Sequence, residues 1–275
     1  DVKTAKEAGV KIIHRSDLLA ELSQAECLIT VGGTSGKSTT TGMLGHIMEH
    51  LDLAPRIIGG AGVVGHVQKG LSYAVVGDGK TAVIEVDESD GSIAKTIPDI
   101  AMLGNISLDH KSMEELRHMF GAYAASAKKG VVVNLDCPEC MACVPKGKNI
   151  LTFSLKSQEA DFFATDICPE SDGVSFKLNG KTPIKLQVLG WYNVANALAA
   201  IAAAHMAGVA AEDGAQALES FAGMKRRLEL IGMANGIQVF DDFAHNPHKI
   251  AASIKALKEY PGRLFIIWQP HGFGP

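Results

Sequence analysis

The chain has 275 residues, of which 47% are hydrophobic and 20% charged, and its formal net charge is −4. Such a composition is typical of a chain that buries a sizeable core, and the length allows about two domains. The acidic balance provides no basic surface for nucleic acid or for an anionic membrane. The weakly polar run 194–211 is mostly alanine, which favours a buried helix over a membrane span. Five cysteines without paired spacing favour a cytoplasmic setting.

The first two thirds of the chain alternate between apolar runs and helical patterns. This order predicts an α/β fold with a mostly parallel sheet. The expected strands are 26–33, 81–86, 99–105 and 131–134, and the expected helices are 37–50 and 112–129. The second helix has a predicted capping box, Ser112 with Glu115, and a predicted stop at Gly130.

From residue 172 onwards the pattern changes to antiparallel hairpins. Asn179-Gly180 and Asn235-Gly236 are typical of tight hairpin turns. A helix is expected from Asn193 to Ala207, another over 247–260, and a strand over 263–268. A domain boundary is expected at 224–227.

A glycine-rich loop joins the first strand to the first of these helices. Its sequence, Gly33-Thr34-Ser35-Gly36-Lys37-Ser38, is one or two residues shorter than the usual phosphate-binding loop. Small residues let amide groups converge on an anion, Lys37 adds a positive charge, and Ser38 offers a hydroxyl to Mg²⁺. The alternative is an ordinary strand–helix turn, but the run of Lys, Ser and Thr after Gly36 favours a nucleotide site.

Acidic and imidazole side chains follow two later strands. Glu85 ends one strand and His110 follows the next, so both are expected at the carboxyl edge of the sheet, where ligands bind. They are candidate Mg²⁺ ligands, although a solvated strand end and a helix-capping neighbour would also explain them. Asp87, Glu88 and Asp90 could hold substrate or metal, or form a solvated acidic loop.

The motifs of this chain, taken in order, resemble those of the Mur ligase family, the ATP-dependent amide-forming enzymes of peptidoglycan synthesis. After the compact glycine loop, the matching segments are EVDESDGS, NISLDH, NLD, GWYNVANA, KRRLELIG, DDFAHNP and QPH, at 85–92, 105–110, 134–136, 190–197, 225–232, 241–247 and 269–271. The shortened loop belongs to this branch of P-loop proteins.

The resemblance implies a set of ATP-binding, catalytic and metal-binding residues. The loop, through Thr39, would hold the phosphates, Asn193 and Asn196 the adenine, and Asp242 the ribose. The catalytic residues would be Lys37, Glu85, His110 and Arg227, and the Mg²⁺ ligands Ser38, Glu85 and His110. Without the resemblance, Asn193 would be read as a helix cap and Asn196 as a buried hydrogen-bonded amide. Arg226 is expected to be a surface charge or a salt-bridge partner, and the role of His245 is open.

The implied reaction joins a carboxylate to an amine through an acyl phosphate formed with ATP. The implied substrates are UDP-N-acetylmuramate and L-alanine. Most of the family carries a modified lysine where this chain has Ala125, and its absence favours the alanine-adding branch. In contrast, Ser35 and Asn246 depart from the usual motifs of the family. The segments KRRLE and DDFAH look more like the tripeptide-recycling ligase, whereas DESDGS and QPH look like the alanine-adding enzyme. A glutamate-adding ligase of folate metabolism and a nucleotide-binding regulatory module are further alternatives.

The resemblance also divides the chain. Residues 1–25 would be the tail of a UDP-binding N-terminal domain, 26–225 the central ATP-binding P-loop domain, and 226–275 the beginning of a truncated, Rossmann-like C-terminal ligase domain. We therefore expect a fragment of a longer protein, and the oligomeric state is open. Cys137, Cys140 and Cys143 could suggest a metal cluster, but thiols three residues apart are more often small buried hydrophobes on one helix face.

Overall fold

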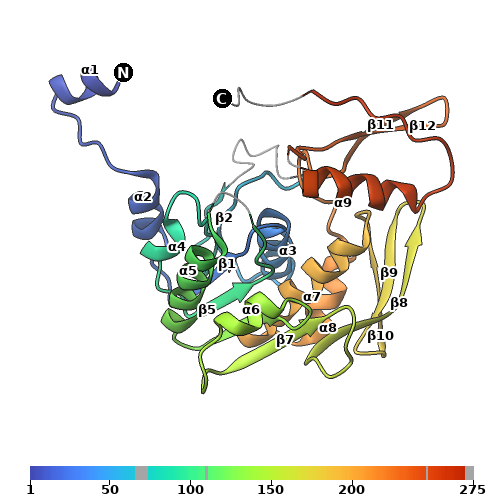
Figure 1. Cartoon of the computed structure of the whole chain (residues 1–275), viewed down its shortest axis with the longest axis horizontal. Helices are drawn as coiled ribbons and strands as arrows, with labels where there is room; N and C mark the ends of the chain where they lie inside the picture. The colour runs from blue at the N-terminus through green and yellow to red at the C-terminus, as the bar shows by residue number, and fades with distance from the viewer. Residues whose placement is uncertain (66–73, 109–110, 246, 270–275) are drawn as a thin grey trace.

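The computed structural model describes residues 1–65, 74–108, 111–245 and 247–269 (Figure 1). The helices are α1 Val2–Glu7, α2 Arg15–Leu22, α3 Lys37–His50, α4 Ser92–Lys95, α5 Met113–Ser126, α6 Pro138–Cys143, α7 Trp191–Met206, α8 Ala211–Leu218 and α9 Pro247–Lys258. The strands are β1 Cys27–Gly32, β2 Arg56–Ile58, β3 Ala74–Val75, β4 Thr81–Glu85, β5 Ile100–Leu103, β6 Gly130–Asn134, β7 Ile150–Ser154, β8 Phe162–Glu170, β9 Gly173–Leu178, β10 Thr182–Leu186, β11 Glu229–Ala234 and β12 Ile237–Asp241.

Within the described ranges, ten strands form one sheet in the order β10-β9-β8-β7-β6-β5-β1-β4-β2-β3. The strands from β8 to β2 pair in parallel, whereas β9, β10 and β3 are antiparallel additions at the two edges. β1 lies between β4 and β5, so the loops that follow these three strands open at the same carboxyl edge. The predicted α/β fold with a mostly parallel sheet and antiparallel hairpins is confirmed.

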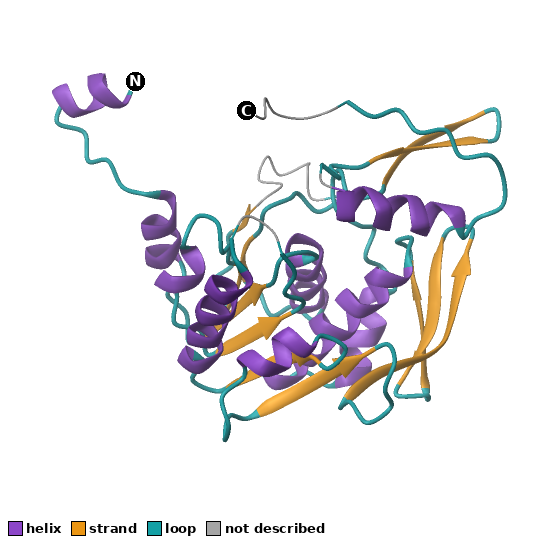
Figure 2. Cartoon of the chain, in the orientation of Figure 1, coloured by secondary structure: helices purple, strands orange, loops and turns teal. Residues whose placement is uncertain are grey.

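Helices cover both faces of the sheet (Figure 2). α3, α7 and α8 pack on one face, while α2, α4, α5 and α6 contribute to a second core on the other. Alternate residues of β1 enter the two cores: Ile29 and Val31 face the first, and Leu28 faces the second. Every residue of β1 is buried, which explains its continuous apolar sequence, because a parallel strand covered on both faces needs no polar side.

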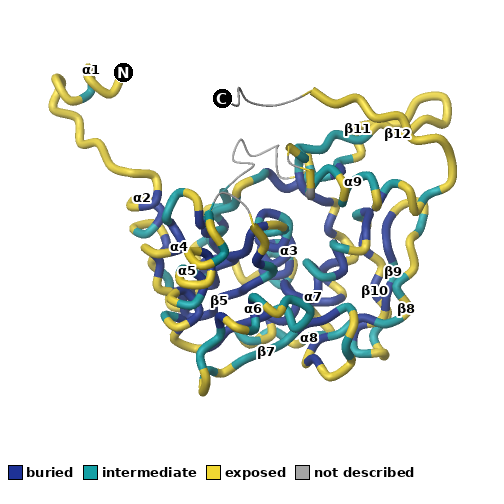
Figure 3. The backbone as a smooth tube through the Cα atoms, in the orientation of Figure 1, coloured by how far each residue is buried: buried dark blue, intermediate teal, exposed yellow. Residues whose placement is uncertain are grey.

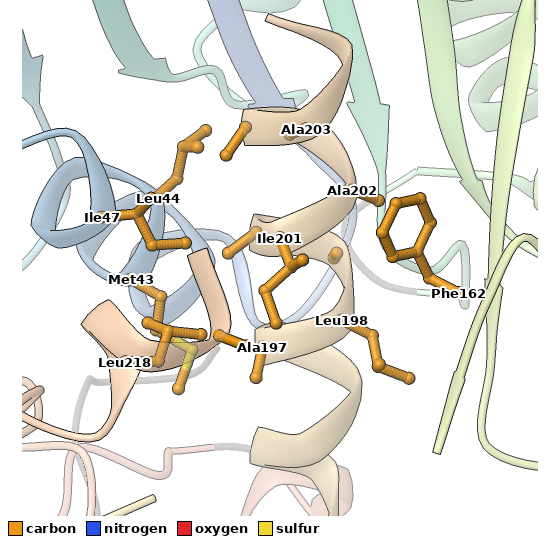
Figure 4. Close-up of a cluster of buried hydrophobic side chains, with 14 of the residues drawn as sticks. Met43, Leu44, Ile47, Phe162, Ala197, Leu198, Ile201, Ala202, Ala203 and Leu218 are labelled. Atoms are coloured by element: carbon orange, nitrogen blue, oxygen red, sulfur yellow. The ribbon is translucent and has the colours of Figure 1, made fainter. Parts of the chain in front are cut away.

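The alanine-rich helix α7 lies at the centre of the first core (Figure 4). Met43, Leu44 and Ile47 of α3 pack on one side of it, and Phe162 of β8 lies on the other. The expected buried helix is therefore confirmed. Among the described residues, no helix has both the length and the apolar character that crossing a membrane would require. Figure 3 places the buried chain in this central region, whereas α1 has no buried residue.

Several local signals are confirmed and two are wrong. The capping box of Ser112 and Glu115 is present, and both Asn-Gly turns have positive φ, at 51° and 69° in the first and 52° and 76° in the second. The helix expected to reach residue 129 ends at Ser126, because the next amides donate to Pro98 O and Asp99 O and lead into β6.

The expected strand over 263–268 is the second error. In the described part of the chain no strand pairs with this segment, and its apolar side chains are exposed, Ile267 fully and Phe265 at 80%. A strand depends on hydrogen bonds to a neighbouring strand, so the apolar pattern alone does not produce one here.

Candidate nucleotide-binding site

The glycine loop between β1 and α3 has a backbone that only glycine adopts easily at two positions. Gly33 has φ 137° and Gly36 has φ 82°. A Cβ at Gly36 would lie 2.6 Å from Asn196 Oδ1, and one at Gly33 would lie 3.1 Å from Asn105 O. The two glycines are therefore required both by the backbone angle and by the close approach of neighbouring chain.

Asn105, in the loop after β5, clamps the glycine loop. Its Oδ1 accepts hydrogen bonds from Thr34 Oγ1 at 2.8 Å and from Ser35 N at 2.9 Å, and its Nδ2 donates to Ser35 O at 2.7 Å. Sequence reasoning noted the segment 105–110 but did not select this residue. The signal that could have identified Asn105 is its position just after a buried strand, one that pairs with β1 in the sheet.

Lys37, the first residue of α3, is paired with two carboxylates. Its Nζ lies 2.9 Å from Glu88 Oε2 and 3.2 Å from Asp87 Oδ2. Burial by itself lowers the pKa of Lys37, but the charges of Glu88 and Asp87 outweigh it and raise that pKa. The side chain of Glu88 is only 4% exposed, so the alternative of a solvated acidic loop is wrong for this residue.

Glu85 and Ser38 bring oxygen atoms together where β4 ends and α3 begins. Ser38 Oγ donates to Glu85 Oε1 at 3.1 Å, and Gly60 N donates to Glu85 Oε2 at 2.6 Å. A hydroxyl and a carboxylate form a hard oxygen set, the kind that suits Mg²⁺. His110, the third predicted metal ligand, lies outside the described residues.

The two asparagines of α7 contact each other. Asn196 Nδ2 donates to Asn193 Oδ1 at 2.9 Å, and Asn193 Nδ2 donates to Leu189 O at 2.8 Å. Thr40 Oγ1 donates to Asn196 Oδ1 at 3.3 Å, which links α7 to α3. Gly190 occupies the N-cap of α7, so the reading of Asn193 as that cap is wrong.

One cavity of about 540 Å³ brings most of the predicted site residues together. Its lining includes residues from the glycine loop, from the ends of β4 and β5, from α7 and from the segment after β12. The predicted residues among them are Thr34, Ser35, Gly36, Lys37, Ser38, Thr39, Glu85, Asn193, Asn196, Arg227 and Asp242. Gly33 is not part of this lining and lies against Asn105. The functional roles of all the predicted site residues stay predictions.

The segments after α8 close the cavity on one side. The Arg227 guanidinium lies 5.9 Å from the ring centre of Phe243, and Asp242 Oδ2 accepts a hydrogen bond from Ser253 Oγ. Arg226, expected to be a surface charge, is 59% exposed and pairs with Asp241 at 3.6 Å. Lining residues that sequence reasoning missed include Asn134, Trp191, Tyr192 and Lys249.

Comparison with known protein families identifies both parts of the chain. Residues 31–204 match the Mur ligase middle domain, and residues 226–271 match the Mur ligase glutamate ligase domain. The chain belongs to the Mur ligase family. The resemblance expected from the motifs is thus confirmed.

Individual members of the Mur ligase family are similar over nearly the whole chain. This chain is 37% identical to the UDP-N-acetylmuramate–L-alanine ligase of Dictyoglomus turgidum, and the match covers 98% of this chain. It is 35% identical to the corresponding ligase of Trichormus variabilis, and that match covers 99% of this chain. The matched region is 60% of the first relative and 58% of the second. The chain therefore spans less than two thirds of the length of these relatives.

Solved Mur ligase structures are similar in fold. The UDP-N-acetylmuramate–alanine ligase of Thermotoga maritima has a TM-score of 0.74 and 28% identity, over 89% of this chain and 56% of that one. A murein peptide ligase from Psychrobacter arcticus has a TM-score of 0.73 and 26% identity, over 94% of this chain and 60% of that one. The structural relatives therefore include an alanine-adding ligase and a murein peptide ligase.

Proposed function

We propose that this Mur ligase chain is the ATP-binding part of an enzyme that joins UDP-N-acetylmuramate to L-alanine. The observation that carries the proposal is the cavity of about 540 Å³ in which the glycine loop, Glu85, the α7 asparagines and Arg227 meet. The alanine-adding relatives support the choice of substrates.

In this proposal the cavity binds ATP along its length. The amides of residues 33–39 and the start of α3 hold the phosphates, because unpaired N–H groups at a helix start attract anions. Asn193 and Asn196 offer amide donors and acceptors to the adenine edge. Asp242 accepts a hydrogen bond from the ribose, and the planar Arg227 guanidinium binds phosphate oxygens.

Ser38, Glu85 and His110 are the proposed Mg²⁺ ligands. The contact between Ser38 Oγ and Glu85 Oε1 supports the first two, because both residues line the cavity and these oxygen atoms lie 3.1 Å apart. A bound Mg²⁺ ion would neutralise charge on the phosphates.

The proposed chemistry needs positive charge, because the substrate carboxylate and the ATP phosphates repel each other. Attack of that carboxylate on the γ-phosphate gives an acyl phosphate, which the amino group of L-alanine then displaces. Lys37 and Arg227 are the cavity cations proposed to stabilise this transfer, and preorganised charge of this kind is the main catalytic means in phosphoryl transfer. Lys37 must first exchange its carboxylate partners for phosphate.

The domain division at 25/26 and 225/226 and the cytoplasmic setting are part of the same proposal. The two family matches, 31–204 and 226–271, support the second boundary. The free state of all five cysteines is compatible with a reducing compartment.

Nucleotide binding is tested with Lys37→Ala, measured by calorimetry with ADP and ATP. Loss of the ammonium group is expected to weaken binding by at least about tenfold, since charge-assisted hydrogen bonds contribute about 1.5–3 kcal/mol. Lys185→Ala is the control, because Lys185 also binds two carboxylates but lies away from the cavity. Equal affinities for wild type and Lys37→Ala would show that the glycine loop does not bind the nucleotide.

The acceptor is tested by phosphate release from the intact protein with ATP, Mg²⁺ and UDP-N-acetylmuramate. The proposal expects release with L-alanine and much less with a muramyl tripeptide. The reverse preference would assign the recycling reaction, an alternative that the similarity to a murein peptide ligase supports. Release with a folate substrate and glutamate would assign the folate branch, and release with none would leave a nucleotide-binding regulatory module.

A further inference from the structure

Two cysteines of the C-P-E-C sequence at 137–140 are placed differently by α6. Cys137 is the N-cap of this helix, with an extended backbone at φ −109° and ψ 99°, and it is partly exposed. Cys140 is the third helical residue and is completely buried. Neither sulfur lines the 540 Å³ cavity, so the proposed ligase reaction does not use them.

Cys137 and Cys140 are three residues apart at the N-cap and N3 positions of α6. Side chains with this spacing lie on the same side of a helix, so the two thiols are neighbours at its start. A Cys-x-x-Cys sequence at a helix start is the arrangement that redox-active dithiols use.

Burial makes the two thiols chemically unequal, because Cys137 is partly exposed and Cys140 is completely buried. Interaction with the Cys140 side chain holds the pKa of Cys137 below its ordinary value. The same interaction, together with burial, raises the pKa of Cys140. Cys137 is thus the accessible nucleophile, and Cys140 is a protected second thiol beside it.

The third thiol of α6 is excluded from this pair. Cys143 Sγ donates to Arg117 O at 3.6 Å, and burial raises the pKa of Cys143. Among the described residues, no group of three or more His, Cys, Asp or Glu side chains could hold a metal ion. The sulfur geometry thus favours a dithiol over a metal ligand set.

We propose that Cys137 and Cys140 are a redox-active dithiol that is converted to an intramolecular disulfide by a low-molecular-weight disulfide. The Cys137 thiolate attacks one sulfur of the small disulfide, its S–S bond breaks, and one small thiolate leaves. The Cys140 thiol then loses its proton, its sulfur attacks Cys137 Sγ, and the second small thiolate leaves. Two protein thiols are oxidised and one small disulfide is reduced to two thiols.

The intact protein is tested by incubation with oxidised glutathione, alkylation with N-ethylmaleimide, trypsin digestion and mass spectrometry. Cleavage after Lys129 and Lys146 gives one peptide, 130–146, that contains Cys137, Cys140 and Cys143. We expect three alkyl groups on this peptide before oxidation and one afterwards, placed on Cys143 by fragmentation. Dithiothreitol is expected to restore all three.

Variants distinguish the pair from general oxidation. Cys143→Ser and Cys168→Ser are expected to leave disulfide formation intact, whereas Cys140→Ser is expected to stop at a mixed disulfide of Cys137 with glutathione. Limited alkylation at neutral pH is expected to modify Cys137 at least about tenfold faster than Cys140 in the reduced wild type.

Three results would overturn the proposal. The first is a wild-type peptide that keeps three alkylated cysteines under these conditions, and the second is a disulfide that includes Cys143. The third is Cys140 reacting as fast as Cys137. Because the decisive measurements use the wild type and do not involve ATP, they remain interpretable if the proposed ligase function is wrong.

Discussion

Glu88→Gln tests whether Glu88 competes with nucleotide phosphate for Lys37. In the structure, Lys37 is 10% exposed and Glu88 4% exposed, with 2.9 Å between Nζ and Oε2. A phosphate that binds Lys37 must take the place of this carboxylate, and the carboxylate must then stay beside the phosphate. The glutamine amide keeps a hydrogen-bond acceptor but removes the negative charge.

The magnitude follows from the difference between an ion pair and a hydrogen bond in which only Lys37 is charged. Hydrogen bonds to charged groups contribute about 1.5–3 kcal/mol, with the pair of two charged groups near the upper end and the bond with one charged group near the lower end. Replacing the side chain of residue 88 by phosphate at Lys37 therefore costs about 1.4 kcal/mol less free energy in the variant. This difference corresponds to about tenfold tighter ATP binding. Because Asp87 remains 3.2 Å from Lys37, the ammonium keeps one counterion. We therefore expect the free energy of unfolding to fall by only about 1–2 kcal/mol.

The assay is calorimetric titration with ATP at fixed Mg²⁺ and salt concentration, since screening changes all charged contacts. Glu170→Gln is a matched control, because Lys185 also lies 2.9 Å from Glu170 and 3.0 Å from a second carboxylate, that of Asp172. Neither Glu170 nor Lys185 lines the cavity, so the control is expected to leave ATP affinity unchanged. Unchanged affinity in Glu88→Gln would refute the competition, and weaker binding would make Glu88 a contributor to the nucleotide site.

Three further predictions concern the loop, the ion pair and the metal. Asn105→Ala is expected to weaken ADP binding by about 1–3 kcal/mol through the loss of the clamp, whereas Asn149→Ala, at an exposed amide, is expected to leave it unchanged; equal affinities in calorimetry would contradict this. Burial raises the pKa of Asp87, but Lys37 and Ser89 outweigh it and hold that pKa below 3.8. Asp87→Asn is therefore expected to lower the free energy of unfolding in urea at pH 6, and this difference should shrink as the pH falls below 3.8; a pH-independent difference would argue against the ion pair. Chelation of Mg²⁺ is expected to weaken ATP binding to the wild type more than to Glu85→Gln, and an equal loss in both would exclude Glu85 as a ligand.

The parts of the fold that could be predicted from the sequence depend on contacts between neighbouring residues. The bounds of α3, the Ser112 capping box and the two Asn-Gly turns each follow from side chains within a few positions of one another. The glycine loop was also recognisable, because Gly36 is required by its own backbone angle. The short strands β2 and β3 carry too few residues for a periodic pattern, and they were missed.

The sequence by itself thus determined the α/β class, the phosphate-binding loop and the Mur ligase motifs, because these are written in local spacing and order. Only the tertiary structure decided which groups meet. It pairs Lys37 with Glu88, places the Asn105 amide against the glycine loop, and separates Cys137 from Cys140 by burial although both belong to one short motif. The physical reason is that strand pairing and helix packing bring residues 50 to 70 positions apart into contact, and burial then sets their charge and reactivity.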